Sequence, residues 1–491
     1  MKTLQDVWPQ TPAKYARVVF DRIVSDSRHA GPGALFVALK GSRHDGRQFI
    51  AQVIHQGVSA VLSENEHTRE ENGIPVIGIP DLSARLGEIA DCFYGSPGAS
   101  MQVVAITGTN GKTSIAQLIA RAVASMGRKA GVLGTLGNGL IGELSPSTHT
   151  TLDPLQLHHW LARFRDSGAD VVALEASSHG LEQGRLNGVR IRTAIFTNLT
   201  RDHLDYHGTM ASYQAAKAKL FQWSGLDTAI LNADDPASEA FAVLLTPDVR
   251  CWRYSQNPAS PAEFAALAVK PSLEGLFVRC RTPFGDCDLN TRLLGRFNIS
   301  NLLAVLAGLL SVGVGLDDAV AAISRLEPVP GRMQCLGGNG VMVVVDYAHT
   351  PDALEKVLTA LREHVQGSLW CVFGCGGDRD AGKRPLMGCI AARLADVGVL
   401  TSDNPRSEDP ETIIGHILTG IQGGANVRVI LDRREAIRAA ILSAEAGDMV
   451  LVAGKGHEDY QEIQGVRHHF DDVEEVRYAL RLRADRETNC V

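Results

Sequence analysis

A short apolar run that ends in a glycine-rich turn and continues as a helix constrains the fold of this chain most strongly. Residues 102–106 read Gln-Val-Val-Ala-Ile, residues 107–113 read Thr-Gly-Thr-Asn-Gly-Lys-Thr, and a helical pattern follows to Met126. A strand that leads directly into a helix in this way is typical of a parallel sheet with helices on both faces. The sequence therefore predicts an α/β protein.

The order of strands and helices divides the chain into three predicted domains. Residues 1–98 indicate a small mixed α/β domain that ends at the turn-forming Ser96-Pro97-Gly98. Residues 99–330 predict a central P-loop-type parallel sheet, which closes at prolines that cannot continue a helix. Residues 331–491 predict a Rossmann-like doubly wound sheet. Strands are expected at 34–39, 60–62, 102–106, 171–174, 194–196, 229–231, 343–345, 369–373, 397–401, 427–431 and 449–453.

Length and charge limit the classes of protein to consider. A chain of 491 residues exceeds one hydrophobic core, and about 150 residues per domain suggests three. The formal charge of -7 disfavours binding to nucleic acid or to a membrane surface, and no apolar run reaches the ~18 residues of a membrane span. The first residues lack a signal-peptide core and the nine cysteines form no CxxC pair. We therefore expect a cytoplasmic protein with reduced thiols.

The turn after residue 106 is predicted to bind phosphate. Its glycines let successive backbone N–H groups face one phosphate, and the following helix adds its positive N-terminal end. Lys112 can reach the β- and γ-phosphates of a nucleotide, and the Thr113 hydroxyl can bind Mg²⁺. The alternative is an incidental glycine turn, because Ile106 makes this the shorter Gly-x-x-Gly-Lys-Thr form. The predicted contacts are Gly108, Thr109, Asn110, Gly111, Lys112, Thr113 and Ser114.

Polar residues also follow the next two predicted strands of the central domain. Glu175 ends one strand, and His203 lies in the loop after its neighbour. Because ligands bind at the carboxyl ends of parallel strands, we expect both residues to hold a metal ion beside the phosphate loop. The alternative is that residues such as Ser177 and Asp202 only cap the following helices. Lys217 lies on a helical stretch and, from the residues alone, is expected on the surface.

Taken together, these motifs resemble the Mur ligase family. The resemblance rests on the short phosphate loop, Glu175, Asn198-Leu199-x-x-Asp202-His203, Leu294-Gly295-Arg296-Phe297-Asn298-Ile299-Ser300-Asn301, Gly331-Arg332 and Asp346-Tyr347-Ala348-His349-Thr350-Pro351. These motifs span essentially the whole chain in one order. The resemblance implies a central ATP-binding ligase domain that uses ATP and Mg²⁺.

The resemblance also implies roles for single residues. Asn298 would contact adenine, Arg332 the phosphates and Asp346 the ribose. Lys217 falls where several family members carry a carbamylated lysine that helps to position Mg²⁺, which overturns the surface expectation. The implied catalytic residues are Lys112, Lys217 and His203, and the implied metal ligands are Thr113, Glu175, His203 and Lys217.

Within the family, the details resemble the members that add meso-diaminopimelate to UDP-N-acetylmuramoyl-L-Ala-D-Glu. The segment Asp26-Ser27-Arg28 resembles their uridine-binding domain, so Ser27 is expected to contact that substrate. The segments at 149–151 and 177–185 resemble their contacts to the muramoyl dipeptide. The implied contacts are Thr150, Thr151, Ser178, Gln183 and Arg185. The small molecules are the only partners implied, and we expect a monomer.

The last domain carries three polar loops that should converge on one amino-acid pocket. The far end of meso-diaminopimelate bears a carboxylate, which suits the planar fork of arginine, and an ammonium group. Arg379 and Arg406 fit the carboxylate, while Glu458 and the Gly454 carbonyl fit the ammonium group. The alternative is that Arg406 is a loop residue paired with Glu408 or Asp409. The predicted pocket consists of Arg379, Asp403, Asn404, Arg406, Gly454 and Glu458.

The most specific hypothesis is an ATP-dependent ligase that forms its amide bond through an acyl phosphate. Three alternatives stay open on sequence alone. One is a Mur ligase that adds lysine or a dipeptide, which Arg406 disfavours. Another is folylpolyglutamate synthase, which the uridine-type first domain disfavours. The third is a nucleotide-binding regulatory protein without activity, which Lys112, Glu175 and Lys217 disfavour together.

Overall fold

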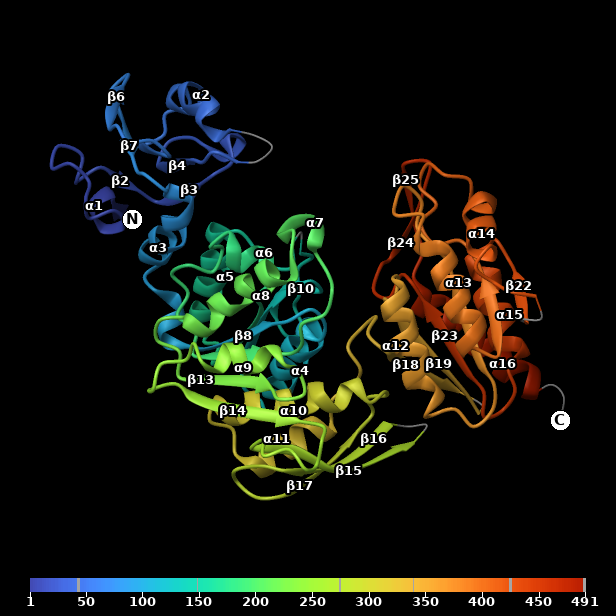
Figure 1. The fold of residues 1–491 in the computed structure, drawn as a ribbon. Coiled ribbons are helices and arrows are strands. Elements are labelled where there is room, and N and C mark those ends of the chain that lie inside the picture. Colours follow the sequence, from blue (N-terminus) through green and yellow to red (C-terminus); the bar gives the residue numbers. More distant parts are fainter. Residues whose placement is uncertain (42–44, 148, 273–274, 339, 424–425, 489–491) are drawn as a thin grey trace. The chain divides into compact units, whose positions relative to one another are not determined.

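The computed structural model describes residues 1–491 except 42–44, 148, 273–274, 339, 424–425 and 489–491. The chain forms two compact units (Figure 1). The first holds Met1–Ala265 and Leu303–Ala322, and the second holds Ala266–Leu302 and Ile323–Val491. None of the helices in the described ranges combines the length and the apolar character needed to span a membrane. The division into three domains at residues 98 and 330 stays a prediction.

The first unit begins with an α/β segment that contains a two-stranded sheet, β1 with β2, and a five-stranded sheet. Its elements are β1 (Lys2–Thr3), α1 (Leu4–Val7), β2 (Val19–Phe20), β3 (Arg22–Val24), β4 (Ala34–Ala38), α2 (Ile50–His55), β5 (Ala60–Ser63), β6 (Arg69–Glu71), β7 (Ile74–Gly78) and α3 (Leu82–Tyr94). The strand order is β3-β4-β5-β7-β6, with β6 antiparallel at the edge. In β4, Leu35 and Val37 pack toward α3, while Phe36 packs toward α2. Because successive strand residues face opposite sides, a sheet covered on both faces needs an unbroken apolar run.

A larger, mainly parallel sheet follows in the same unit. Its elements are β8 (Gln102–Thr107), α4 (Lys112–Ser125), β9 (Ala130–Gly134), β10 (Gly137–Leu140), α5 (Pro154–Asp166), β11 (Val171–Glu175), α6 (Ser178–Glu182), β12 (Thr193–Phe196), α7 (Leu204–His207), α8 (Met210–Ala218), β13 (Thr228–Asn232), α9 (Ala237–Ala242) and β14 (Arg250–Ser255). The strand order runs β10-β9-β11-β8-β12-β13-β14 and continues with β15 (Phe264–Ser272), β16 (Gly275–Arg281) and β17 (Cys287–Thr291), and β10 is antiparallel at the edge. The central strand β8 therefore lies between β11 and β12. This order brings the loops after all three strands to one edge of the sheet.

The rest of the chain forms a six-stranded sheet, two hairpins and several helices, and its residues Leu303–Ala322 belong to the first unit. The elements from 264 onward are β15 (Phe264–Ser272), β16 (Gly275–Arg281), β17 (Cys287–Thr291), α10 (Phe297–Ser311), α11 (Leu316–Ser324), β18 (Gln334–Gly338), β19 (Val341–Asp346), α12 (Pro351–Arg362), β20 (Leu369–Phe373), α13 (Lys383–Leu394), β21 (Val397–Leu400), α14 (Pro410–Leu418), β22 (Val427–Val429), α15 (Arg433–Ser443), β23 (Met449–Ala453), β24 (Tyr460–Ile463), β25 (Val466–His469) and α16 (Asp472–Thr488). The strand order β18-β19-β23-β20-β21-β22 is parallel except for β18. One core packs under α12, α13 and α14, and another under α15 and α16.

These sheets confirm the predicted α/β class and the predicted strands. The predicted strand at 427–431 is shorter than expected, because β22 is an edge strand whose Val429 is exposed. The antiparallel pair β16 and β17 was not predicted. Its alternating burial, with Val278 buried and Arg279 exposed, is the period-two signal that could have revealed it.

Candidate active site

The phosphate loop lies between the carboxyl end of β8 and the start of α4. Gly108 has a φ of +144°, and a Cβ atom there would lie 1.8 Å from the Thr197 hydroxyl oxygen. Only glycine fits this close approach. The helix α4 begins at Lys112 without a side-chain cap, so its first N–H groups and its positive end face the loop. This geometry suits an anion, as predicted.

Two residues after β12 hold the loop in shape. The Asn110 N–H donates to the Asn198 side-chain oxygen at 3.0 Å, and the Thr109 N–H donates to the Asn198 carbonyl at 2.8 Å. The Thr197 hydroxyl donates to the Asn110 carbonyl at 2.5 Å. The sequence prediction included neither Thr197 nor Asn198 among the site residues. Their position directly after a buried strand was the signal that could have found them.

Lys112 folds back over this loop. Its ammonium group donates to the carbonyls of Gly108 and Thr109, each at 2.9 Å. Loop carbonyls are neutral partners, and a phosphate would offer this ammonium group a stronger, charged one. The lysine is therefore placed where a nucleotide phosphate would recruit it.

Glu175 and Thr113 meet at the predicted metal position. The Thr113 hydroxyl donates to Glu175 Oε2 at 2.8 Å, and the Thr135 N–H donates to Glu175 Oε1 at 2.7 Å. Both Thr113 and Glu175 are buried. A hydroxyl and a carboxylate oxygen at the phosphate loop match the oxygen ligands that Mg²⁺ prefers. In the described ranges, no three His, Cys, Asp or Glu side chains gather closely enough to hold a metal by themselves.

Lys217 is buried, so the expectation of a surface lysine was wrong. Only 1% of the residue is exposed, and its Nζ donates to the Gly108 carbonyl at 2.8 Å. The Tyr213 ring lies 4.3 Å from the same nitrogen. Burial lowers the pKa of Lys217 well below its ordinary value, and the charge of Lys112 lowers it further. Lys217, which lies on α8, therefore contacts the phosphate loop through its side chain.

His203 lies in a group of aromatic and histidine rings beside this lysine. Its ring centre is 4.9 Å from that of His179 and 6.1 Å from that of Tyr213. His203 is the residue before α7, with a φ of +52°, and its own side chain does not cap that helix. Asp202 Oδ1 accepts from the His203 N–H at 2.8 Å. Ser177 does cap α6, since its hydroxyl accepts from the Gly180 N–H at 3.1 Å. The capping alternative is therefore confirmed for Ser177, and Asp202 binds the backbone just before α7.

Four of the five residues predicted to contact the muramoyl dipeptide, namely Thr150, Thr151, Gln183 and Arg185, belong to one hydrogen-bond network. The Arg185 guanidinium donates to the Thr151 carbonyl at 2.7 Å and to the Gln183 side-chain oxygen at 2.7 and 2.9 Å. The Thr151 hydroxyl donates to the Glu175 carbonyl at 2.7 Å. The Thr135 hydroxyl donates to that of Thr150 at 3.2 Å. The network therefore reaches the carboxylate that meets the phosphate loop.

Ser178 belongs to the same region and contacts a histidine that was not predicted. Its hydroxyl lies 2.9 Å from His207 Nε2, and His207 Nδ1 lies 3.0 Å from a Glu182 carboxylate oxygen. Both Ser178 and His207 are buried. The predicted uridine contact, Ser27, lies instead in a 3₁₀ turn after β3 of the smaller sheet. Asp26 caps that turn and pairs with Arg28 at 2.6 Å.

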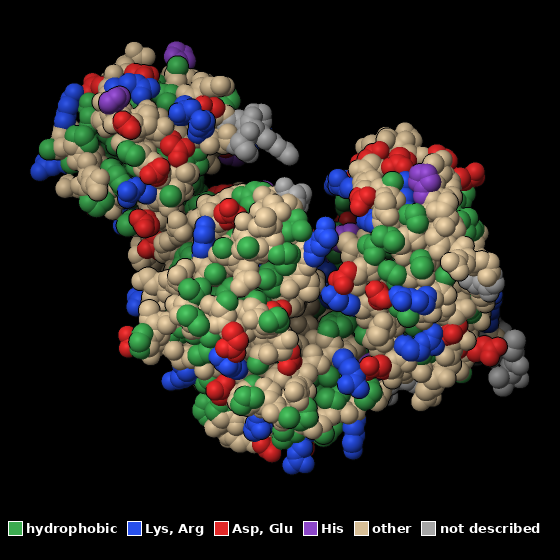
Figure 2. Space-filling model, in the orientation of Figure 1, with side chains coloured by type: hydrophobic (Ala, Val, Ile, Leu, Met, Phe, Trp, Pro, Cys, Tyr) green, Lys and Arg blue, Asp and Glu red, His purple; other side chains and the backbone are tan. Residues whose placement is uncertain are grey.

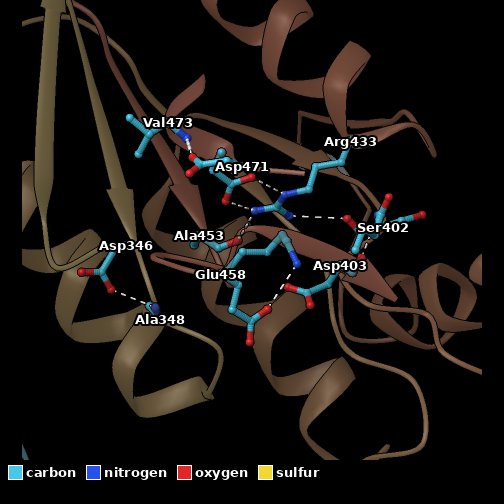
Figure 3. A network of polar contacts seen from close by, with 12 residues as sticks. Asp346, Ala348, Ser402, Asp403, Arg433, Ala453, Glu458, Asp471 and Val473 are labelled. Carbon is cyan, nitrogen blue, oxygen red and sulfur yellow. Dashed lines mark hydrogen bonds and ion pairs between the residues drawn. The ribbon is translucent and has the colours of Figure 1, made fainter. Parts of the chain in front are cut away.

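The second unit holds the three predicted nucleotide contacts. Asp346 ends β19 and accepts from the Met333 N–H at 2.7 Å. It also accepts from the Ala348 N–H at 2.8 Å, as Figure 3 shows. Burial raises the pKa of Asp346, while the charge of Arg332 opposes that shift. The buried Nε of Arg332 has no hydrogen-bond partner among the described residues. Asn298 is buried near the start of α10 and donates to the Leu294 carbonyl at 2.7 Å.

The loops after β21 and β23 converge, as predicted. Asn404 is buried and donates to Glu458 Oε2 at 2.9 Å. Asp403 Oδ1 accepts from the Asn404 N–H at 2.7 Å. Gly454 has a φ of +118°, and a Cβ atom there would lie 2.5 Å from the Asp403 carboxylate. These four predicted residues therefore line one small region.

Arg406 lies at the side of this region with a φ of +52°. Its Nη1 donates to the Gly377 carbonyl at 2.8 Å, and its Nε lies 3.8 Å from Glu462. The predicted alternative pairing with Glu408 is wrong, because Glu408 binds Arg384 at 2.8 Å. The alternative pairing with Asp409 is also wrong, since that residue caps α14. Arg379 is exposed and lies close to Gly376, because a Cβ atom added to that glycine would be 3.8 Å from the Arg379 Cγ.

Two buried cations that the sequence prediction missed support this pocket. Lys455 is fully buried, and its Nζ lies 3.1 Å from Asn404 Oδ1 and 3.2 Å from Glu458 Oε2. Arg433 forms a fully buried ion pair with Asp472 at 2.7 Å. Figure 3 shows Arg433 directed at the Ser402 and Ala453 carbonyls, to which it donates at 3.5 and 3.0 Å. Arg433 thereby ties together the ends of neighbouring strands.

Acidic and basic side chains intermingle on the face shown in Figure 2. No single basic surface dominates that face, in keeping with the formal charge of -7. A nucleic-acid-binding surface needs clustered Lys and Arg.

Comparison with known proteins places the chain among ligases. Family models match at residues 20–94 ("Mur ligase family, catalytic domain"), 106–309 ("Mur ligase middle domain") and 331–456 ("Mur ligase, glutamate ligase domain"). The UDP-N-acetylmuramoyl-L-alanyl-D-glutamate–2,6-diaminopimelate ligase of Chromobacterium violaceum is 49% identical over 468 residues, which is 94% of each chain. The enzyme of that name from Pseudomonas aeruginosa is 46% identical, covering 97% of this chain and 98% of its own.

A solved structure agrees with these relatives. A structure described as UDP-N-acetylmuramoyl-L-alanyl-D-glutamate–2,6-diaminopimelate ligase is 42% identical, with a TM-score of 0.78. The match covers 98% of this chain and 99% of that one. Fold, site motifs and relatives agree over nearly the full length, and the chain belongs to the Mur ligase family.

Proposed function

We propose that this protein is an ATP- and Mg²⁺-dependent ligase that joins meso-diaminopimelate to the D-Glu γ-carboxylate of UDP-N-acetylmuramoyl-L-Ala-D-Glu, a step of peptidoglycan precursor synthesis. Relatives that carry this activity in their names align over 94–98% of their own lengths. The observation that carries the choice of amino acid is the position of Arg406. Its guanidinium has one neutral partner, the Gly377 carbonyl, and one carboxylate at 3.8 Å.

The first unit supplies the groups that a phosphoryl transfer needs. Backbone N–H groups of the loop and the start of α4 would hold the phosphates, and Lys112 would turn from the loop carbonyls to the γ-phosphate. Thr113 and Glu175 would hold Mg²⁺, with His203 and a modified Lys217 as the other proposed ligands. When bound, Mg²⁺ neutralises charge that develops on the transferred phosphoryl group.

The burial of Lys217 supports its proposed carbamylation. An amine attacks CO₂ only when it is neutral, and burial favours the neutral form of Lys217. The amine nitrogen would form a bond to the CO₂ carbon and release one proton, which leaves a carbamate anion. Mass spectrometry of the intact protein prepared with and without bicarbonate would detect the added CO₂. If the intact mass of fresh, bicarbonate-saturated protein lacked the added CO₂, this result would contradict the modification.

We further propose that the amide bond forms in two steps. The D-Glu γ-carboxylate would attack the γ-phosphorus of ATP, which breaks the bond to the bridging oxygen and releases ADP. The neutral amine of diaminopimelate would then attack the acyl carbon, form the amide bond, and release phosphate and one proton. The carboxylate oxygen that attacked then leaves with the phosphate. With ¹⁸O in the γ-carboxylate, one ¹⁸O should therefore appear in the released phosphate. Phosphate without ¹⁸O would exclude the acyl phosphate.

The activity is tested by phosphate release from ATP with Mg²⁺ and UDP-N-acetylmuramoyl-L-Ala-D-Glu. Three parallel reactions contain meso-diaminopimelate, L-lysine or no amine. We expect turnover with meso-diaminopimelate alone. Turnover with lysine instead would keep the ligase and overturn the interpretation of Arg406. Absence of turnover with every amine would favour the non-catalytic nucleotide-binding alternative.

A further inference from the structure

Lys455 has no place in the proposed chemistry, although it is one of the most deeply buried charged residues of the second unit. Its relative exposure is 0%, and it follows β23 by two residues. A buried ammonium group costs several kcal/mol unless it is paired and hydrogen-bonded. The partners of this lysine therefore indicate why it is there.

Those partners are two residues of the proposed amino-acid pocket. Nζ of Lys455 lies 3.1 Å from Asn404 Oδ1 and 3.2 Å from Glu458 Oε2. Asn404 closes the triangle by donating to the same Glu458 oxygen at 2.9 Å. The three side chains come from two loops, one after β21 and one after β23. Lys455 is thus the charge that joins the two loops.

The triangle leaves Glu458 with a defined orientation. All its described side-chain hydrogen bonds and ion pairs fall on Oε2, so Oε1 has none among the described residues. The Asn404 oxygen is also held, because it accepts from the Glu462 N–H at 3.0 Å. Without Lys455, Glu458 would lose the cation that fixes its orientation.

We propose that Lys455 is a positioning residue, which holds Glu458 and Asn404 so that the free carboxylate oxygen receives the ammonium end of the amino-acid substrate. This inference rests on the proposed function, because it assumes a diamino-acid substrate. Lys455 itself would not touch the substrate. Its loss should weaken binding of the amino acid and leave the nucleotide site unchanged.

The test measures KM for each substrate in the wild type, Lys455→Met and a matched control. Methionine keeps the length of the side chain and removes its charge. We expect KM for meso-diaminopimelate to rise about tenfold or more, as for an interaction lost from substrate binding. KM for ATP should change less than about twofold. A KM for meso-diaminopimelate within twofold of the wild type would overturn the inference.

The control is Asp448→Asn, at the opposite end of the same strand. Asp448 is buried, and it accepts from the Ser368 N–H at 2.7 Å and from the Trp370 ring N–H at 3.1 Å. Its replacement should lower the melting temperature and leave KM for meso-diaminopimelate unchanged. An equal rise of KM in both variants would show that general destabilisation is the cause, and would overturn the inference.

If Lys455→Met does not fold, the double variant Lys455→Met/Glu458→Gln removes both charges. It is compared with Glu458→Gln alone. We expect the two to have the same KM for meso-diaminopimelate, because Lys455 acts through Glu458. A further tenfold rise in the double variant would contradict this. Wild-type protein without diaminopimelate-dependent turnover would instead refute the proposed function.

Discussion

Each unit contains one buried lysine beside its own site, and these two lysines differ in their hydrogen-bond and ion-pair partners. Lys217, in the first unit, donates to the Gly108 carbonyl, and the charge of Lys112 acts against its own. Lys455, in the second unit, meets the Glu458 carboxylate and the Asn404 amide oxygen. A buried amine with a neutral partner tends to lose its proton, whereas a carboxylate partner holds the charge. The first arrangement suits a reactive group and the second suits a fixed cation.

The two sites also differ in what they offer a ligand. The phosphate loop offers backbone N–H groups, which every substitution except one by proline leaves in place. The pocket after β21 and β23 offers side chains such as Arg406 and Glu458, whose identity decides the ligand. We therefore expect the first site to determine whether the reaction occurs and the second to determine which amine is used.

The largest effect is expected for Lys112→Ala. Loss of this ammonium group should lower kcat about 10³-fold, because it stabilises charge on the transferred phosphoryl group. Phosphate release at saturating substrates measures it. Lys219→Ala, at an exposed lysine of the same unit, is the matched control and should keep full activity. More than a tenth of wild-type activity in Lys112→Ala would remove the first site from the chemistry.

The next largest effect should appear in the amine site. Arg406→Ala should raise KM for meso-diaminopimelate about 100-fold, since a carboxylate of the substrate loses its charged partner. KM for ATP should stay the same. The control is Arg393→Ala, because Arg393 is an exposed residue of α13 that pairs with Glu355. An unchanged KM for meso-diaminopimelate would show that Arg406 does not face the substrate.

A smaller effect concerns the stability cost of burying Lys217. The folded protein disfavours the proton on this amine, while the unfolded chain keeps it up to its ordinary pKa of 10.5. The unfolded state therefore binds more protons, and the free energy of unfolding must rise with pH. In CO₂-free buffer, the melting temperature of the wild type relative to Lys217→Met should rise from pH 7 to pH 10. A constant difference would mean that the amine is protonated in the fold.

The smallest effect is expected at His457, beside Arg332 in the second unit. Burial and the charge of Arg332 lower the pKa of His457 from 6.5 to about 4. Between these values the unfolded chain binds a proton that the fold excludes, so stability falls as the pH falls from 6.5 to 4. His457→Asn should flatten this part of the curve of melting temperature against pH. An identical curve for the variant would contradict the assignment.

The sequence predicted the parts of the protein that depend on neighbouring residues. The strand at 102–107, the loop at 108–111 and the helix from Lys112 follow from apolar runs, glycines and a helix start that lie next to one another in the chain. The loops after β21 and β23 were predicted to converge because parallel strands place their carboxyl ends at one edge. Arg406 could be singled out because the chemistry of a carboxylate demands a guanidinium group.

Tertiary structure alone decided the environments of the remaining site residues. Lys217 is 109 residues from Gly108 and Lys455 is 51 residues from Asn404, and a lysine in a helix or loop is expected at the surface until packing is known. Thr197 and Asn198 likewise gain their roles from strands that become neighbours only in the folded sheet. The residue types of the sites and the order of helices and strands could therefore be predicted from the sequence. The burial, the charged partners and the protonation of the site residues could not be predicted, because they depend on contacts between distant segments.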